Sequence, residues 1–334
     1  MRPPQLDVVD PDLPAARIST TAPSVVVYRL EAAGHRQTGL VVEVAVEDYR
    51  QHRIRRHEAT RPEQERELDE LAETSGREQV PVTLTYPVRS SPRPALEEIT
   101  AAVPEVVHTD AGGVTHSVWT RREPELLREI HEELDRVAAL YIADGHHRMA
   151  AADRRANRRS RAEFTLAALF PSDEMRVLGY HRSIARPART RADVLDALAD
   201  QPSVGGIEEC SAETARTAPG TVLMCLDGTW YRMSLRTPRA SADVRSSLDV
   251  VALDENVLPG AFGPNGGQPR ATRLPTEDPH QAARWCAEGG TIGFLPHPPE
   301  VEQIMAVSDA GQLMPPKSTW FDPKTGSGLF HRAI

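Results

Sequence analysis

The stretch Val137-Ala138-Ala139-Leu140-Tyr141-Ile142-Ala143-Asp144-Gly145-His146-His147-Arg148 decides how we interpret the fold of the whole chain. Its first seven residues form an apolar run that predicts a buried β-strand. The run stops at Asp144-Gly145, and a helical pattern follows through Met149 and Ala152. Asp144 stands where an N-cap residue is expected, and Gly145 lets the backbone turn sharply. The sequence therefore predicts a strand, a tight turn and a helix in succession.

The first turn of this predicted helix carries His146, His147 and Arg148. A helix N-terminus presents free backbone N–H groups and a partial positive charge. Two imidazoles and a guanidinium beside those groups predict an anion site, most simply a phosphate site. The alternative is structural: Asp144 caps the helix, Arg148 pairs with a surface acid, and the histidines pack. Adjacent histidines point to different sides of a helix, so we favour the phosphate site.

The composition is that of a globular protein with a proper core. The chain has 334 residues, of which 40% are hydrophobic, enough for two domains or one large one. No apolar run reaches the roughly 18 residues of a membrane-spanning helix, and the N-terminus lacks the apolar region of a signal peptide. Three widely spaced cysteines favour reduced thiols over a disulfide framework or a zinc site. We therefore expect a cytoplasmic protein without a membrane partner.

Charge argues against a general nucleic-acid binder, because the net charge is −9 and such proteins need a basic face. The local clusters Arg53–Arg56 and Arg154–Arg161 are typical of solvated helix faces. Among 39 basic residues, only Lys317 and Lys324 are lysines, and they lie together in Met314-Pro315-Pro316-Lys317-Ser318-Thr319-Trp320-Phe321-Asp322-Pro323-Lys324. Lysine supplies a compact charge that arginine does not mimic. This tail is therefore predicted to be a second phosphate-binding segment.

Periodicity predicts alternating strands and helices along the rest of the chain. The expected strands are 24–30, 39–46, 80–86, 106–108, 114–119, 164–170, 177–184, 221–226, 229–235 and 291–295. The expected helices are 63–74, 96–102, 124–134, 193–200, 253–258, 280–288 and 301–308. Residues 1–22 are expected to be partly loose, and 260–270 to form a glycine/proline connector.

His57 and Glu58 precede one of these helices. Thr60, with Pro62 and Glu63 behind it, is predicted to form a capping box for the helix over 63–74. Glu58 needs no such structural role, and a carboxylate on a loop is free to act as a base. The plain alternative is an ordinary solvated acid among the 48 acidic residues.

The chain resembles the DUF1015 family over nearly its whole length. The segments that carry the resemblance are Tyr28, Gly39-Leu40, Glu47-Asp48-Tyr49, Ile54, His57-Glu58-Ala59-Thr60, Tyr141–Arg148, His181-Arg182, Leu248-Asp249, Met314–Phe321, Pro323-Lys324 and Ser327-Gly328-Leu329. The family is one of uncharacterised proteins, so this resemblance implies a shared fold without an activity.

The His-Glu-x-Thr and Asp-Gly-His-His-Arg strings also resemble, more distantly, the ParB/sulfiredoxin-like fold and its free-serine kinases. This resemblance implies an α+β protein in which 1–190 is a ParB-like mixed-sheet domain that binds a nucleotide and carries the catalytic residues. Because the organisation of the chain changes near residue 190, we expect residues 191–334 to form a smaller α+β domain whose C-terminal tail returns to the active site. The resemblance implies Glu58 as the base for a substrate hydroxyl, and the turn from Asp144 to Arg148 as the site for phosphate and metal.

Together these observations predict a small-molecule kinase that uses ATP or ADP with Mg²⁺ to phosphorylate free serine or a related hydroxy amino acid. The catalytic residues would be Glu58 and Asp144, with Asp144 also holding the metal. Nucleotide or phosphate would bind Gly145, His146, His147, Arg148, Lys317, Ser318 and Thr319. Substrate would bind His57, Thr60, His181, Arg182 and Lys324.

Two other functions stay open at this point. One is a ParB-like regulator that binds a nucleotide and a partner. The other is a metal-dependent hydrolase of a phosphorylated substrate, although adjacent histidines suit one metal poorly, because ligands three or four residues apart share a helix face. No nucleic-acid partner is expected, and a homodimer is left open.

Overall fold

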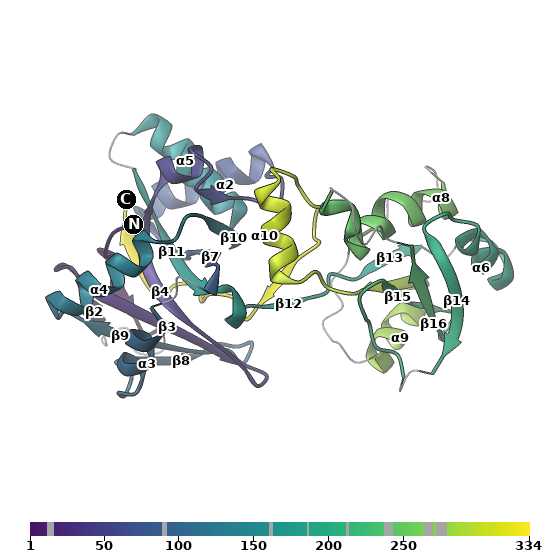
Figure 1. Ribbon diagram of the computed structural model, residues 1–334, viewed down its shortest axis with the longest axis horizontal. Coiled ribbons are helices and arrows are strands. Elements are labelled where there is room, and N and C mark those ends of the chain that lie inside the picture. The colour runs from purple at the N-terminus through teal and green to yellow at the C-terminus, as the bar shows by residue number, and fades with distance from the viewer. Residues whose placement is uncertain are drawn as a thin grey trace. The chain divides into compact units, whose positions relative to one another are not determined.

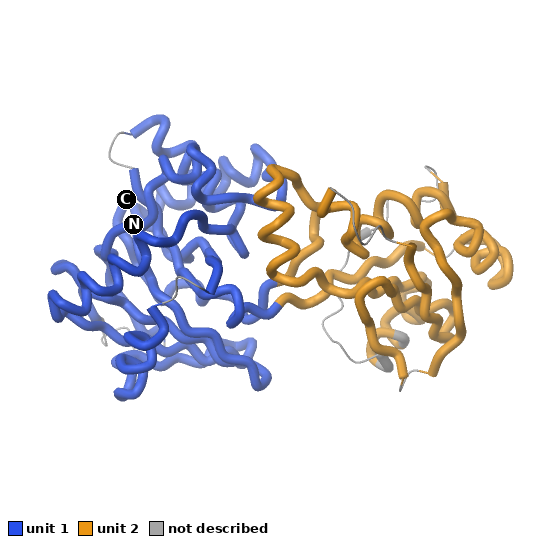
Figure 2. The backbone as a smooth tube through the Cα atoms, in the orientation of Figure 1, with its two compact units in different colours: residues 1–176, 321–334 blue, residues 177–320 orange. Residues whose placement is uncertain are grey.

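The structure is a computed structural model that describes residues 1–11, 17–88, 92–159, 163–185, 187–211, 214–236, 243–263, 270–271 and 279–334. The chain divides into two compact units (Figure 2). Unit 1 comprises Met1–Arg176 and Phe321–Ile334, and unit 2 comprises Val177–Trp320. The end of the chain therefore belongs to the same unit as its beginning.

Unit 1 is built on a mixed sheet, which in the described residues has eight strands in the order β5-β10-β7-β11-β4-β3-β9-β8 (Figure 1). Strand β10 lies next to the edge strand β5 and runs parallel to it and antiparallel to β7, which itself runs parallel to β11. The predicted α+β class with a mixed sheet is confirmed. The strands are β3 (Val25–Ala32), β4 (His35–Ala45), β5 (Ile54–Arg55), β7 (Val82–Tyr86), β8 (Val106–Thr109), β9 (Thr115–Arg121), β10 (Leu140–Asp144) and β11 (Phe164–Pro171).

The helices of unit 1 are α1 (Val46–Arg50), α2 (Pro62–Ser75), α3 (Arg93–Thr100), α4 (Pro124–Asp135) and α5 (His146–Arg158), with the short η2 (Ser172–Glu174). Among them, α1, α3, α4 and α5 contribute buried apolar residues to the core cluster of this sheet. Met149 and Ala152 of α5 lie in one core cluster with Leu84 of β7 and Ile142 of β10. These apolar contacts hold α5 directly behind the strand that leads into it.

A second, smaller sheet joins the two ends of the chain. In the part of the chain that is described, its order is β2-β1-β20-β6, with β1 (Asp7–Val9), β2 (Arg17–Ser19), β6 (Arg77–Glu78) and β20 (Phe330–Ala333). Within the stretch 1–22, which was expected to be partly loose, β1 and β2 are therefore ordered by strand pairing. Val8 is fully buried and pairs with Phe330, because the C-terminal strand supplies the partner that a short N-terminal strand lacks on its own.

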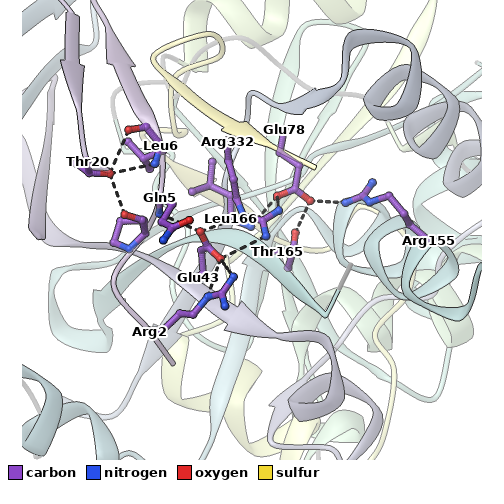
Figure 3. Close-up of polar contacts among 11 residues, drawn as sticks. Arg2, Gln5, Leu6, Thr20, Glu43, Glu78, Arg155, Thr165, Leu166 and Arg332 are labelled. Carbon is purple, nitrogen blue, oxygen red and sulfur yellow. Dashed lines mark hydrogen bonds and ion pairs between the residues drawn. The ribbon is translucent and has the colours of Figure 1, made fainter. Parts of the chain in front are cut away.

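Buried charges connect β20 to both sheets (Figure 3). The Arg332 guanidinium lies between Glu43 of β4, at 3.2 Å, and Glu78 of β6, also at 3.2 Å. Glu78 accepts further hydrogen bonds from the Thr165 hydroxyl and the Leu166 backbone N–H, and it pairs with Arg155 of α5. Arg332 is therefore a cation that two carboxylates share, and each of them has a second arginine: Arg2 beside Glu43 and Arg155 beside Glu78.

Unit 2 contains a separate sheet, with six strands among the described residues, in the order β14-β16-β15-β18-β13-β17. The strands are β13 (Arg182–Ala185), β14 (Val204–Cys210), β15 (Thr221–Leu226), β16 (Thr229–Leu235), β17 (Arg270–Ala271) and β18 (Thr291–Pro296). The helices are α6 (Arg191–Ala199), η3 (Arg245–Ser247), α7 (Asp249–Val251), the π-helix η4 (Ala252–Val257), α8 (Leu258–Phe262), α9 (Pro279–Glu288) and α10 (Val301–Asp309). The described helices include none with both the length and the apolar content needed to span a membrane.

Several predicted elements need correction. The single strand expected over 177–184 is two strands, β12 (Arg176–Leu178) and β13, because they belong to different sheets. The connector expected over 260–270 begins inside α8, and 264–269 lie outside the described residues. Thr60 does not cap α2, because the helix starts at Pro62 after Arg61, and the Thr60 hydroxyl donates to Glu65 instead.

Replacing Arg332 with glutamine should destabilise unit 1, because it removes the cation that Glu43 and Glu78 share and leaves each carboxylate with only its other arginine, Arg2 or Arg155. We expect urea denaturation to show a loss of about 3–5 kcal/mol in the free energy of unfolding, the scale for breaking one side of a buried ion pair. Arg128→Gln is the matched control, since Arg128 pairs with Glu132 on the exposed surface of α4. Equal stability of the two variants would contradict this account.

Candidate active site at the β10–α5 turn

Gly145 makes the turn between β10 and α5 possible. Its backbone lies in the left-handed region, with φ of 96°, and it occupies the N-cap position predicted for Asp144. A Cβ atom on Gly145 would lie 2.7 Å from the Arg148 Nη2 atom, so the guanidinium folds closely over the turn. Asp144 is instead the last residue of β10, because the strand pairing continues to its contact with Thr83.

The N-terminus of α5 carries no side-chain cap. The helix has 13 residues, and the N–H groups of its first turn have no intrahelical acceptor. The uncapped N-terminus of a helix of this length carries a partial positive charge and free hydrogen-bond donors, and this arrangement binds anions.

The Asp144 carboxylate holds two cations beside this helix end. Its Oδ2 atom accepts from Arg148 Nη2 at 2.7 Å, and its Oδ1 atom pairs with Lys324. Arg148 also donates to the Pro81 carbonyl oxygen at 3.2 Å. Burial alone would raise the pKa of Asp144, but the two cations outweigh it and lower that pKa to about 2. Asp144 is therefore ionised and orients cations, which makes it a poor proton acceptor.

The segment after Phe321 places Lys324 at this position. Thr325 Oγ1 lies 3.3 Å from Thr83 Oγ1, and the Gly326 N–H donates to the Tyr28 hydroxyl at 3.0 Å. The same hydroxyl is 2.7 Å from Nδ1 of His116, whose Nε2 lies 3.3 Å from Asp110. Tyr28 and His116 are completely buried, so this chain of hydrogen bonds is a fixed support for the lysine segment.

Glu58, His57 and His146 meet beside the same helix end. The two imidazole rings are 4.5 Å apart and nearly perpendicular, and both are buried. Burial lowers the pKa of His57 to about 4 and the pKa of His146 well below its usual value. His146 Nδ1 lies 3.9 Å from Glu58 Oε2, beyond hydrogen-bond length. A carboxylate and two neutral imidazoles therefore stand next to the open N-terminus of α5.

His147 and Thr60 make contacts that connect α5 with the start of α2. The Nε2 atom of His147 accepts a hydrogen bond from the backbone N–H of Arg61 at 3.1 Å. Thr60 Oγ1 donates to Glu65 at 2.7 Å. His147 contacts the start of α2 and His146 contacts His57, so the two adjacent histidines do not point to the same site.

A cavity of about 600 Å³ lies along the adjoining face of α5. Ala150, Asp153, Arg154 and Asn157 line it, and these positions follow His146 at helical spacing. Four arginines line the cavity against two carboxylates: Arg50, Arg56, Arg154 and Arg158, with Asp153 and Glu65. The sequence analysis assigned Arg56, Arg154 and Arg158 to solvated faces and did not single out Arg50. For Arg154, which lies on α5, the helical spacing from His146 was a signal that could have found it.

The residues around Asp144 do not form a magnesium site by themselves. Both carboxylate oxygens of Asp144 already contact cations, and within the described ranges no three His, Cys, Asp or Glu side chains gather to hold a metal. Mg²⁺ is often held by only one or two carboxylates together with substrate phosphates. The chain's own donors therefore fit a metal that arrives with a nucleotide better than a resident one.

The remaining predicted site residues belong to unit 2. The buried guanidinium of Arg182 pairs with both Asp254 oxygens, at 2.9 and 2.7 Å, and donates to the Lys317 carbonyl oxygen at 2.8 Å. Lys317 has φ of 60°, and its Nζ lies 5.7 Å from the Tyr180 ring centroid. The buried Ser318 hydroxyl donates to Pro315 O at 2.6 Å.

Two further predicted residues lie beside these. Burial lowers the pKa of His181 to about 4. Thr319, which follows Ser318, is partly exposed. Through its hydrogen bond to the Lys317 carbonyl oxygen, Arg182 fixes the loop that carries Lys317 within unit 2.

A family model matches residues 18–251, which is more than half of the chain, and its description is "Protein of unknown function (DUF1015)". The chain belongs to the DUF1015 family. The predicted membership is confirmed, although the lysine segment lies beyond the matched residues. No curated protein matches the chain.

Solved structures resemble this DUF1015 protein at low sequence identity. A C-terminally truncated SbnI from Staphylococcus aureus is 14% identical, with a TM-score of 0.46 and coverage of 86% of this chain and 85% of the other. A free serine kinase variant in complex with ADP is 14% identical, with a TM-score of 0.43 and coverage of 88% and 94%. A conserved hypothetical protein from Pyrococcus furiosus is 13% identical, with a TM-score of 0.41 and coverage of 86% and 94%.

The low pKa of Asp144 predicts how the free energy of unfolding depends on pH. Because its folded pKa of about 2 lies below the usual 3.8, Asp144 stabilises the fold above pH 4, and that contribution disappears as pH falls towards 2. We expect Asp144→Asn to lower the free energy of unfolding by about 2 kcal/mol near neutral pH, and the gap to close between pH 4 and pH 2. Asp135→Asn on exposed α4 is the control. A gap that is constant with pH would refute the two-cation arrangement.

Proposed function

We propose that this protein is a small-molecule kinase that transfers a phosphoryl group from ATP or ADP to the hydroxyl of free serine or a related hydroxy amino acid. The observation that carries the proposal is the pairing of Asp144 with both Arg148 and Lys324 at the open N-terminus of α5. Phosphoryl transfer needs charge neutralisation, positioning of the reactants and a residue that orients the nucleophile. Each requirement has a candidate in unit 1.

The phosphate groups would bind at the first turn of α5. Backbone N–H groups of His146 and His147 would donate to phosphate oxygens, and Arg148 offers a planar guanidinium for the same charge. Lys324 supplies a compact ammonium that can follow the transferred group or neutralise the acceptor carboxylate. Asp144 keeps both cations in place before the nucleotide arrives, which reduces the ordering needed on binding.

The cavity beside α5 supports a nucleotide as the donor. It begins one helical turn beyond His146, at Ala150, so a group bound at the helix end continues directly into it. A volume of about 600 Å³ lies within the usual range for small-molecule sites. Its excess of arginines favours an anionic ligand in a chain whose overall charge is −9.

Glu58 is the proposed general base. Its carboxylate lies beside His146, and its side chain is only partly exposed, with 26% of its surface accessible. In this mechanism the acceptor hydroxyl gives its proton to Glu58, and the acceptor oxygen bonds to the terminal phosphorus of the nucleotide. The bond from that phosphorus to its bridging oxygen breaks, so that ATP leaves as ADP, or ADP as AMP. His57 and Thr60, from the same segment, would contact the acceptor. The acceptor class rests on the resemblance of His-Glu-x-Thr and Asp-Gly-His-His-Arg to free-serine kinases.

The proposal also includes Mg²⁺ and the unit 2 residues. Asp144 would hold Mg²⁺ through its carboxylate, and the bound ion would supply charge neutralisation on the phosphates of the nucleotide. Lys317, Ser318 and Thr319 are kept as proposed phosphate ligands, and His181 and Arg182 as proposed substrate contacts. Arg182 would act mainly through the Lys317 loop that it holds.

A direct assay separates this proposal from a regulator and from a hydrolase. The full chain is incubated with ATP or ADP, Mg²⁺ and serine, threonine or homoserine, and phosphorylated amino acid is followed by ³¹P NMR. We expect a phosphomonoester that appears only with an amino acid present. Nucleotide binding without turnover would favour the regulator, and release of inorganic phosphate from phosphoserine would favour the hydrolase; either would overturn the kinase.

The variant Glu58→Gln tests the base. Because the amide cannot accept the proton, we expect turnover to fall by about 10²–10⁴-fold, the usual contribution of a positioned base, with nucleotide affinity nearly unchanged. The control is Glu63→Gln, which removes one negative charge in the same way from an exposed residue in the first turn of α2. Normal turnover in Glu58→Gln removes Glu58 from the mechanism, and lost nucleotide binding would make it a phosphate-site residue.

A further inference from the structure

Unit 2 contains a cavity of about 400 Å³ that the proposed kinase chemistry does not use. Three segments enclose it: the turn before β15 at Gly220, the start of α7 at Asp249, and the loop from His297 to the first turn of α10. All three belong to unit 2, so the cavity is independent of the turn at Asp144. Its volume is in the range of small-molecule sites.

A buried carboxylate lies in the wall of this cavity. Asp249 is only 9% exposed, and its Oδ2 atom accepts the Gly220 backbone N–H at 2.8 Å. Within the residues that the structure describes, no Lys, Arg or His forms an ion pair with it. Burial raises the pKa of Asp249 to about 6, and the backbone N–H groups of Gly220 and Thr221 offset only part of that effect. Buried carboxylates are normally compensated by a cation.

The other described groups that line the cavity are apolar, neutral or acidic. Leu248, Val250 and the Pro298-Pro299 pair give it an apolar side, and no lysine or arginine lines it. Burial lowers the pKa of His297, whose Nδ1 lies 3.2 Å from Thr217 Oγ1, and this shift favours the neutral form of the ring. Glu300 is the N-cap of α10, where its side chain and that of Gln303 form a capping box. An anion would therefore meet two carboxylates and no counter-charge.

We propose that this cavity is a binding site for a small organic amine, whose ammonium group pairs with the Asp249 carboxylate while its carbon chain lies against Leu248, Val250 and the two prolines. The ammonium supplies the compensating charge that Asp249 lacks among its described neighbours. The apolar wall favours an alkylamine over a hydrated metal ion. In the described part of the chain, three potential metal ligands do not come together here or elsewhere.

Titration of the full chain with n-butylammonium at pH 7.5 tests this site, by calorimetry and by ligand-observed NMR. n-Butanol is the matched uncharged probe, and Mg²⁺ and K⁺ are the inorganic probes. We expect saturable binding of butylammonium, roughly tenfold or more weakened by Asp249→Asn, because the variant keeps the shape and removes the charge. The control Glu302→Gln, an exposed residue of α10 outside the cavity, should bind as the parent does.

Four outcomes would overturn the proposal: absence of butylammonium binding, equal binding of butanol, unchanged affinity in Asp249→Asn, or full displacement of the amine by Mg²⁺ or K⁺ at equal concentration. If Asp249→Asn fails to fold by circular dichroism, Glu300→Gln replaces it, since a glutamine oxygen still caps α10 while one negative charge is lost. We expect weaker amine binding in that variant, and unchanged affinity would reject the site.

Discussion

The ion pairs of Arg332 with Glu43 and Glu78 are the constraint on which unit 1 depends (Figure 3). They fix the C-terminal strand β20 between β1 and β6, and Glu78 connects this arrangement to α5 through Arg155. Because β20 is held there, the segment before it must pass Thr83 and Tyr28, and this path brings Lys324 to Asp144. The candidate site therefore needs both ends of the chain, and a lysine 180 residues away from Asp144 completes it.

The parts of this fold that could be predicted from the sequence are those with a local cause. The apolar run up to Ala143, the glycine at position 145 and the helical pattern behind it predict the β10–α5 turn correctly. The capping details could not be predicted in the same way. Thr60 and Asp144 both have the residue type of an N-cap, but each lies one residue too early, because the following Arg61 and Gly145 take that position.

What escaped prediction depends on contacts between distant segments. Strands as short as β1 and β20 have too few residues for a periodic pattern, and each exists because the other pairs with it. The hydrogen bonds from Asp110 through His116 to Tyr28 are similarly invisible in sequence. Lysine usage pointed to Lys317 and Lys324 together, whereas the structure assigns them to different units and brings Lys324 to the Asp144 carboxylate. Composition identified the segment, and only tertiary structure separated the two residues.

The central claim is that the open end of α5, with Arg148 and Lys324 held by Asp144, binds the phosphates of a nucleotide. Calorimetric titration of ATP and of ADP into the parent and into Arg148→Ala tests it most directly, with Arg128→Ala on exposed α4 as the control. A hydrogen-bonded charge at this position contributes about 1.5–3 kcal/mol, so we expect Arg148→Ala to weaken the affinity for at least one of the nucleotides by roughly 10- to 150-fold. Affinity equal to that of the parent and of Arg128→Ala would contradict the account.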